Sequence, residues 1–133
     1  MSGYLLDTDT CSHHFRGSQS VTERAANHAE ELHLSTVTLA ELLTWTLRTN
    51  AAPKWHRLLL RFLDAAQALH VTPEVAERCG QIRAEMYDQG HAVPIADMLI
   101  AATALVHNLT LVTHNTKHFA AVPGLMLEDW VTP

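Results

Sequence analysis

Short apolar runs alternate with longer amphipathic segments along the whole chain. The first run, residues 4–6, has three apolar residues without polar alternation, which is typical of a strand buried on both faces of a parallel sheet. Similar runs predict four further strands, near residues 33–35, 69–71, 109–112 and 125–127. Between them, helical spacing and capping residues predict helices over residues 11–15, 20–32, 38–47, 55–68, 73–89 and 94–106.

This alternation of strands and helices indicates βαβ units with right-handed crossovers. We therefore expect an α/β fold, with a central, mostly parallel sheet of four to five short strands and helices on both faces. The sequence contains no internal repeat, no low-complexity tract and no linker that would mark a boundary. We expect residues 1–133 to form a single domain.

The segment 94–106 is apolar on nearly every side, which predicts a helix in the centre of the domain. Its only charge is Asp97, in the first turn. Burial of a lone carboxylate costs several kcal/mol, of which the helix dipole offsets only about 0.3–1 kcal/mol. Asp97 is therefore either a helix cap or a ligand of a metal ion, and the ion explains the cost better.

Other polar side chains are expected at the same rim of the sheet. Asp7 and Asp9 follow the first strand, Glu41 lies in the first turn of the helix after the second, and Thr113 and Asn115 follow the fourth. In open α/β sheets, binding sites lie beyond the carboxyl ends of the strands. Converging carboxylates repel one another unless cations lie among them, and oxygen ligands favour Mg²⁺ or Mn²⁺. Such ions activate water for phosphodiester hydrolysis. For Asp7 alone, an Asx-turn or a helix cap is an equally simple interpretation.

Composition narrows the class of protein. The chain has 133 residues, 47% of them hydrophobic and 17% charged, as in a folded globular domain. Its formal net charge of −5 argues against nucleic-acid binding by overall basicity. No run is long enough to cross a bilayer, and no signal-peptide pattern is present, so we expect a cytoplasmic protein whose two cysteines are reduced. The densest basic cluster, on the helix 55–68, is either a solvated face or a patch that contacts RNA or a partner; it comprises Lys54, His56, Arg57 and Arg61.

Four segments together resemble the PIN domain, and more narrowly the VapC-type toxins of bacterial toxin–antitoxin pairs. They are Leu5-Leu6-Asp7-Thr8 with Asp9, Ala40-Glu41-Leu42, Ala96-Asp97-Met98-Leu99-Ile100-Ala101-Ala102 and Leu111-Val112-Thr113-His114-Asn115. Gln81-Ile82-Arg83-Ala84-Glu85, Val122-Pro123-Gly124-Leu125 and Glu128-Asp129-Trp130 are also similar to that subgroup. Each motif is weak alone, but their order and spacing cover nearly the whole chain.

The resemblance implies a three-layer PIN-like fold and a ribonuclease that depends on Mg²⁺ or Mn²⁺. It implies Asp7, Glu41 and Asp97 as metal ligands with Asp9 beside them, and Thr113 and Asn115 as residues that orient water or the scissile phosphate. It also implies a homodimer, an inhibitory VapB-like antitoxin in a toxin–antitoxin hetero-oligomer, and cleavage of tRNA, including initiator tRNA. Many PIN domains have Asn in place of Asp9 and an acid in place of Asn115. These two departures leave open whether one or two metal ions bind.

Three alternatives stay open from the sequence. Asp7 and Asp9 match the nucleophile and acid/base of a haloacid-dehalogenase-like phosphotransferase, although no suitable lysine or later acid pair follows. Histidines near strand ends would suit a metal-independent ribonuclease; they are His13, His14, His114 and His118. A catalytically silent PIN-like module that binds RNA or protein is the third, and Asn115 and the acidic net charge favour it.

Overall fold

The computed structural model describes residues 3–133. Five strands form one sheet: β1 (Tyr4–Leu6), β2 (Leu32–Ser35), β3 (Gln67–Leu69), β4 (Thr110–Val112) and β5 (Leu127–Glu128). Their order is β3-β2-β1-β4-β5, and each neighbouring pair is parallel. The helices are α1 (Thr8–Phe15), α2 (Gln19–Asn27), a 3₁₀ turn (Ala29–Glu31), α3 (Thr36–Thr46), α4 (Pro53–Ala65), α5 (Pro73–Asp88), α6 (Ile95–Val106) and α7 (Thr116–Phe119). The expected α/β fold is confirmed.

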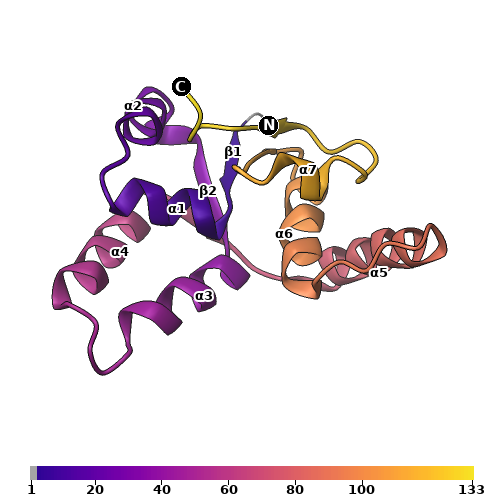
Figure 1. The fold of residues 1–133 in the computed structure, drawn as a ribbon, viewed down its shortest axis with the longest axis horizontal. Helices are drawn as coiled ribbons and strands as arrows, with labels where there is room; N and C mark the ends of the chain where they lie inside the picture. Colours follow the sequence, from indigo (N-terminus) through magenta and orange to yellow (C-terminus); the bar gives the residue numbers. More distant parts are fainter. Residues whose placement is uncertain (1–2) are drawn as a thin grey trace.

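The two central strands are buried on both faces, which explains their continuous apolar sequence. Leu5 pairs with Leu111 and Leu6 with Val112 in the β1–β4 register. Because successive side chains point to opposite faces of a strand, the first pair packs against α5 and α6 and the second against α1, α2 and α4. Figure 1 shows α5 and α6 on one side of β1 and β2, with α1, α2 and α4 on the other.

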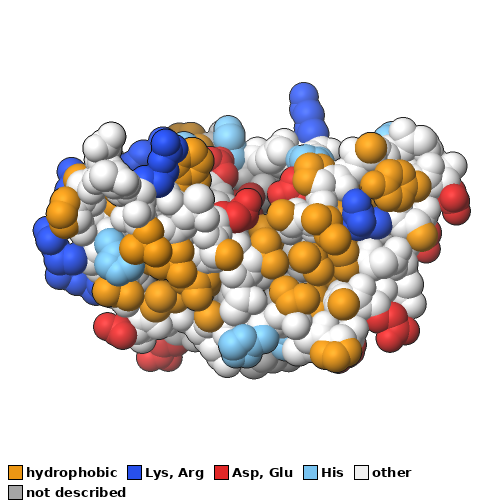
Figure 2. All heavy atoms as spheres, turned by 90° about the horizontal axis from the view of Figure 1, so that it is seen from below, with side chains coloured by type: hydrophobic (Ala, Val, Ile, Leu, Met, Phe, Trp, Pro, Cys, Tyr) orange, Lys and Arg blue, Asp and Glu red, His pale blue; other side chains and the backbone are white. Residues whose placement is uncertain are grey.

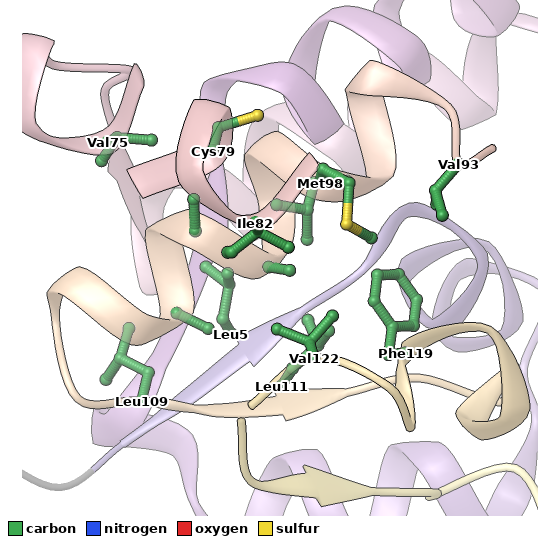
Figure 3. Packing of buried hydrophobic residues seen from close by; sticks show 14 of the residues in the cluster. Leu5, Val75, Cys79, Ile82, Val93, Met98, Leu109, Leu111, Phe119 and Val122 are labelled. Carbon is green, nitrogen blue, oxygen red and sulfur yellow. The ribbon is translucent and has the colours of Figure 1, made fainter. Parts of the chain in front are cut away.

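The packing around α6 agrees with its apolar sequence. Met98 and every residue from Ile100 to Ala104 are buried, and α5 packs along the helix. Figure 3 shows Cys79 and Ile82 of α5 and Met98 of α6 above Leu5 and Leu111 of the sheet. The cysteines Cys11 and Cys79 are both buried and form no disulfide.

Several element boundaries differ from the sequence-based expectation. The first helix begins at Thr8, because Asp7 caps it. The helix after Pro53 ends at Ala65 and the third strand covers Gln67–Leu69, two residues earlier than expected. Ala66, between them, has extended backbone angles (φ −112°, ψ 130°). The last strand is Leu127–Glu128 and not residues 125–127.

None of the helices within residues 3–133 is both long and apolar enough to cross a membrane.

Candidate active site

A pocket of about 640 Å³ opens at the carboxyl ends of the central strands. Four acids line it: Asp7, Asp9, Glu41 and Asp97. They come from the end of β1 and from α1, α3 and α6, so the convergence expected from topology is present. Figure 2 shows acidic side chains gathered in a hollow in the middle of one face.

Asp7 is held firmly at the floor of this pocket. Its backbone N–H donates to the Val112 carbonyl (3.0 Å), and its side-chain Oδ1 accepts a hydrogen bond from the Thr10 N–H (2.8 Å). The residue is only 8% exposed. Burial raises the pKa of Asp7 and Asp9 adds to the rise, although hydrogen bonds from Thr113 and Thr10 lower it. Asp7 is thus both a helix cap and a carboxylate of the pocket, and the two interpretations do not compete.

Asp97 does not cap its helix. The cap position of α6 is Pro94, and no side chain bonds to the first turn. The Asp97 side chain is 33% exposed, so it is less buried than the apolar sequence around it suggests. Burial raises the pKa of Asp97; His118, whose Nδ1 lies 3.6 Å from Oδ2, lowers it, and the Glu41 carboxylate raises it. Because Glu41 raises this pKa, the carboxylates of Glu41 on α3 and Asp97 on α6 lie close enough for their charges to repel.

Glu41 is positioned by a neighbour on another helix. The Thr8 hydroxyl on α1 donates to Glu41 Oε1 (2.6 Å), and the Thr8 oxygen lies 3.2 Å from Oγ1 of the buried Thr38. Thr38 and Glu41 lie three residues apart on α3, and therefore on one face of that helix. This bond joins the two helices at the mouth of the pocket.

The other three expected residues differ in how far they are exposed: Asp9 and Asn115 line the pocket, whereas Thr113 is fully buried. Asp9 lines the pocket, is exposed, and lies 3.6 Å from His13 Nε2. Asn115 also lines it, with its Nδ2 2.9 Å from His118 Nδ1. Thr113 has no exposed surface; its hydroxyl bonds to Asp7 and accepts a hydrogen bond from the Asn115 N–H. Thr113 is therefore a buried hydrogen-bonding neighbour of Asp7.

Comparison with known proteins identifies the family of this chain. The PIN domain family matches residues 4–125. The chain belongs to the PIN-domain family. The resemblance found in its motifs is thereby confirmed.

Its relatives carry VapC names. It is 30% identical over 131 residues to the tRNA(fMet)-specific endonuclease VapC of Salmonella typhimurium, with 98% of this chain and 99% of that protein covered. It is 33% identical, with the same coverage, to the protein of that name from Shigella flexneri. Among solved structures, DNA-bound VapBC from Salmonella typhimurium contains a chain with a TM-score of 0.91 and 30% identity, covering 98% of this chain and 99% of that one.

VapBC2 from Rickettsia felis, bound to a DNA fragment from its promoter, gives a TM-score of 0.89 at 28% identity, covering 98% of this chain and 99% of that one. The likeness extends over nearly the whole chain and not only over the pocket. Membership of the PIN-domain family excludes the haloacid-dehalogenase interpretation of Asp7 and Asp9.

The acids of this PIN domain suit a hard divalent cation by chemistry, since all their donor atoms are oxygens. A cation in the pocket would also offset the burial and repulsion that raise the pKa values of Asp7 and Asp97. Within residues 3–133, however, no three His, Cys, Asp or Glu side chains are gathered closely enough to form a ready-made site. Thr8 bonds Oε1 of Glu41, and Oδ2 of Asp97 lies 3.6 Å from His118. An ion would therefore have to draw the acids closer together, and Oε2 of Glu41 is the oxygen that could approach it while the Thr8 bond is kept.

Several residues of the pocket were not expected from the sequence. Ser12, Trp45, Ile100 and Phe119 line it without having been singled out. His114, singled out from the sequence only as a candidate of a metal-independent ribonuclease, also lines it, and its Nδ1 lies 3.2 Å from Oδ2 of Asp129. Helical spacing offered a signal for Trp45, which lies four residues after Glu41 and so on the same helix face. Nothing local indicated the pairing of His114 with Asp129.

Proposed function

We propose that this chain is a VapC-like toxin: an endoribonuclease that depends on Mg²⁺ or Mn²⁺, cuts tRNA and thereby inhibits translation, and is neutralised by a VapB-like antitoxin. The observation that carries the proposal is the meeting of Asp7, Glu41 and Asp97, from three separate elements, in one pocket. Each residue has a helix or a hydrogen bond that holds it there. The 133 residues would act as one PIN-like domain.

Asp7, Glu41 and Asp97 are the residues that would hold the ion, with Asp9 at the outer edge. A bound divalent cation supplies a Lewis acid, which stabilises charge on the phosphodiester and makes water a better nucleophile near neutral pH. Asp7 is nearly buried and held by hydrogen bonds to Val112 and Thr10, so it would fix the position of the site. Glu41 would accept a proton from the attacking water or act as a ligand, and Thr8 would set its orientation.

Asn115 and Thr113 have supporting roles in this proposal. The Asn115 amide lines the pocket and can donate a hydrogen bond to a phosphate oxygen or orient water, but it adds no negative charge. Thr113 would act indirectly, because its hydroxyl bonds to Asp7. Because Asn115 is not an acid, the proposed ligands are the carboxylates of Asp7, Glu41 and Asp97, with Asp9 as a fourth at the outer edge.

The proposed substrate and partners come from the relatives. Two of them are named tRNA(fMet)-specific endonucleases, so initiator tRNA is the first substrate to test. VapBC complexes among the solved structures support a VapB-like antitoxin and a toxin–antitoxin hetero-oligomer in the cytoplasm, where tRNA is found. Large apolar side chains are exposed, including Leu47 and Ile95, and hydrophobic patches cover much of the face in Figure 2. Exposed apolar patches of this kind favour association, in line with a homodimer.

The test is a cleavage assay with the purified, antitoxin-free protein on total tRNA and on initiator tRNA. We expect cleavage with Mg²⁺ or Mn²⁺, none in EDTA, and a loss of at least about 100-fold in Asp97→Asn. The products should carry 5′-phosphate and 3′-hydroxyl ends. Cleavage that persists in EDTA would support the histidine ribonuclease instead. A folded protein that binds RNA but never cuts it would be the silent module.

A further inference from the structure

A second groove, of about 380 Å³, continues from the acidic pocket between α1, α3 and α4. Asp9, Ser12 and Trp45 line both cavities, so the two adjoin. Away from the acids, the groove is lined by Phe15, Leu42 and a second tryptophan, Trp55. It therefore begins where the proposed cut occurs and ends on an aromatic surface.

The two tryptophans are accessible. Trp45 is 62% exposed and Trp55 is half-buried. Tryptophan is enriched at binding surfaces, where its large ring supplies contact area. Thr46, beside Trp45, accepts or donates a hydrogen bond with His56 Nδ1 (3.2 Å), which ties α3 to α4 and holds the two tryptophans on fixed elements.

Cations lie beside both rings. The Arg48 guanidinium lies 5.6 Å from the centre of the Trp45 ring, and the Lys54 ammonium lies 4.6 Å from the centre of the Trp55 ring. Arg16 adds a third positive charge to the groove wall, whereas Asp9 is the one acid among the residues that line it. Figure 2 shows Lys and Arg side chains collected at the end of the molecule that carries α4. Because the chain as a whole has a net charge of −5, this concentration of positive charge is a local feature of the groove.

Exposed aromatic rings with flanking cations are what unpaired nucleotides require. Bases stack on aromatic side chains when they are not stacked within a duplex, and phosphates pair with Lys and Arg. A purely apolar protein partner would gain nothing from the three cations. A duplex would present phosphates but no free base faces. Single-stranded RNA uses both features of the groove at once.

We propose that this groove binds the unpaired nucleotides next to the scissile phosphate, with Trp45 and Trp55 stacking on bases. Arg16, Arg48 and Lys54 contact the phosphates between them. This inference rests on the proposed ribonuclease function, and it assigns to the substrate a single-stranded segment, such as a tRNA loop, that lies across α1, α3 and α4. The tryptophans bind and position RNA and take no part in bond cleavage.

Binding can be measured without cleavage, because EDTA removes the proposed ion. The probe is a short fluorescent oligoadenylate, followed by anisotropy. We expect Trp45→Ala and Trp55→Ala each to weaken its binding about tenfold, while Trp45→Phe retains most of the affinity. Arg48→Gln and Lys54→Gln should each reduce the dependence of log K on log salt by about one phosphate contact. Double-stranded RNA of the same length should compete poorly.

The chain contains a matched control. Arg83 lies 5.4 Å from the ring centre of the exposed Tyr87 on α5, so this pair has the same chemistry but does not line either cavity. Tyr87→Ala should leave oligoadenylate binding unchanged. Equal loss in Tyr87→Ala, or full binding in both tryptophan-to-alanine variants, would overturn the proposal. So would variants that keep RNA affinity but lose affinity for a VapB-like antitoxin, since the groove would then be a protein interface.

Cleavage of tRNA separates this inference from the proposed function. If the unaltered protein cuts tRNA, we expect the tryptophan-to-alanine variants to raise KM about tenfold with kcat nearly unchanged. If those variants cut tRNA with the same KM as the unaltered protein, the proposed function stands and the proposed role of the groove is wrong. A protein that cuts no RNA refutes the function itself.

Discussion

The hydroxyl of Thr8 donates a hydrogen bond to Oε1 of Glu41 over 2.6 Å. Thirty-three residues separate the two in sequence, and the bond joins the first turn of α1 to the middle of α3. Thr8 follows Asp7 directly, so the cap that fixes Asp7 also places the hydroxyl that orients Glu41. One tight turn at the end of β1 thereby positions two of the three central acids.

Replacing Thr8 with Val tests this coupling. Val has nearly the same shape but no hydroxyl, so Glu41 would lose its orienting bond while packing is kept. Loss of a residue that orients a metal ligand typically lowers metal affinity or activity about 10–100-fold. We expect weaker Mn²⁺ binding by titration calorimetry in Thr8→Val and near-complete recovery in Thr8→Ser. Unchanged Mn²⁺ affinity in Thr8→Val would show that Glu41 needs no support from α1.

Asp97 should destabilise the metal-free protein. Burial and the nearby Glu41 raise its pKa above the ordinary value, so the ionised form is less favourable in the folded state than in the unfolded state. Above the ordinary pKa of Asp, Asp97→Asn should therefore raise the free energy of unfolding in EDTA by about 0.5–1 kcal/mol. The gain should fade as the pH falls and Asp97 takes up a proton in the unaltered protein.

Adding metal should reverse the order of stability. Mn²⁺ binds only the folded state, so it should raise the Tm of the unaltered protein more than that of Asp97→Asn. Asp64→Asn, at an exposed position on α4, is the matched control and should respond to Mn²⁺ like the unaltered protein. The metal-site assignment fails if Asp97→Asn shows the full metal-induced shift.

Asn115 is where a carboxylate can be added. It lines the pocket with the four acids, so Asn115→Asp would add a fifth negative charge there. Ligand charge raises affinity for hard cations. We expect Asn115→Asp to bind Mn²⁺ more tightly and to reach half-maximal activity at lower Mn²⁺ concentration, while losing stability in EDTA through repulsion. If the metal dependence of activity does not move, Asn115 contacts substrate or water and no ion.

Much of this fold could be predicted because a few patterns are strong. The apolar residues at Tyr4–Leu6 and Thr110–Val112 belong to strands covered on both faces, and continuous apolar sequence is what such burial requires. Ile95–Val106 was predicted for the same reason, and Asp97 stood out because an acid is rare in such a helix. Gly90, at φ +81°, stops α5 where it was expected to stop.

The boundary between α4 and β3 could not be predicted, since Ala66 and Ala68 favour a helix by propensity and only tertiary pairing makes this segment extended. Pairing of Leu34 with Ala68 and of Ser35 with Leu69 decides it, and that is a tertiary contact. The same reason hid the second groove. Trp45 and Trp55 lie on different helices, and only the packing of α3 against α4 brings them to one surface.

Asp129 connects the end of the chain to the pocket. Its carboxylate accepts hydrogen bonds from the backbone N–H groups of Val131 and Thr132 and from the Thr132 hydroxyl, at 2.9, 3.2 and 2.7 Å. His114, which lines the pocket, lies 3.2 Å away. Burial raises the pKa of Asp129, but the hydrogen bonds from Thr132, Val131 and His114 outweigh it, so the pKa lies below its ordinary value.

Asp129→Asn should therefore destabilise the protein in a pH-dependent way. A carboxylate whose pKa is lower in the folded state contributes stability that is complete above the unfolded pKa and is lost as the pH falls through the folded value. Near pH 7, we expect a loss of about 1 kcal/mol in the free energy of unfolding, measured with urea. The difference should shrink below about pH 4, where Asp129 becomes protonated. Asp88→Asn, at an exposed helix end, should show no such trend. A deficit of Asp129→Asn that persists unchanged into acid would mean that shape, and not charge, holds this segment in place.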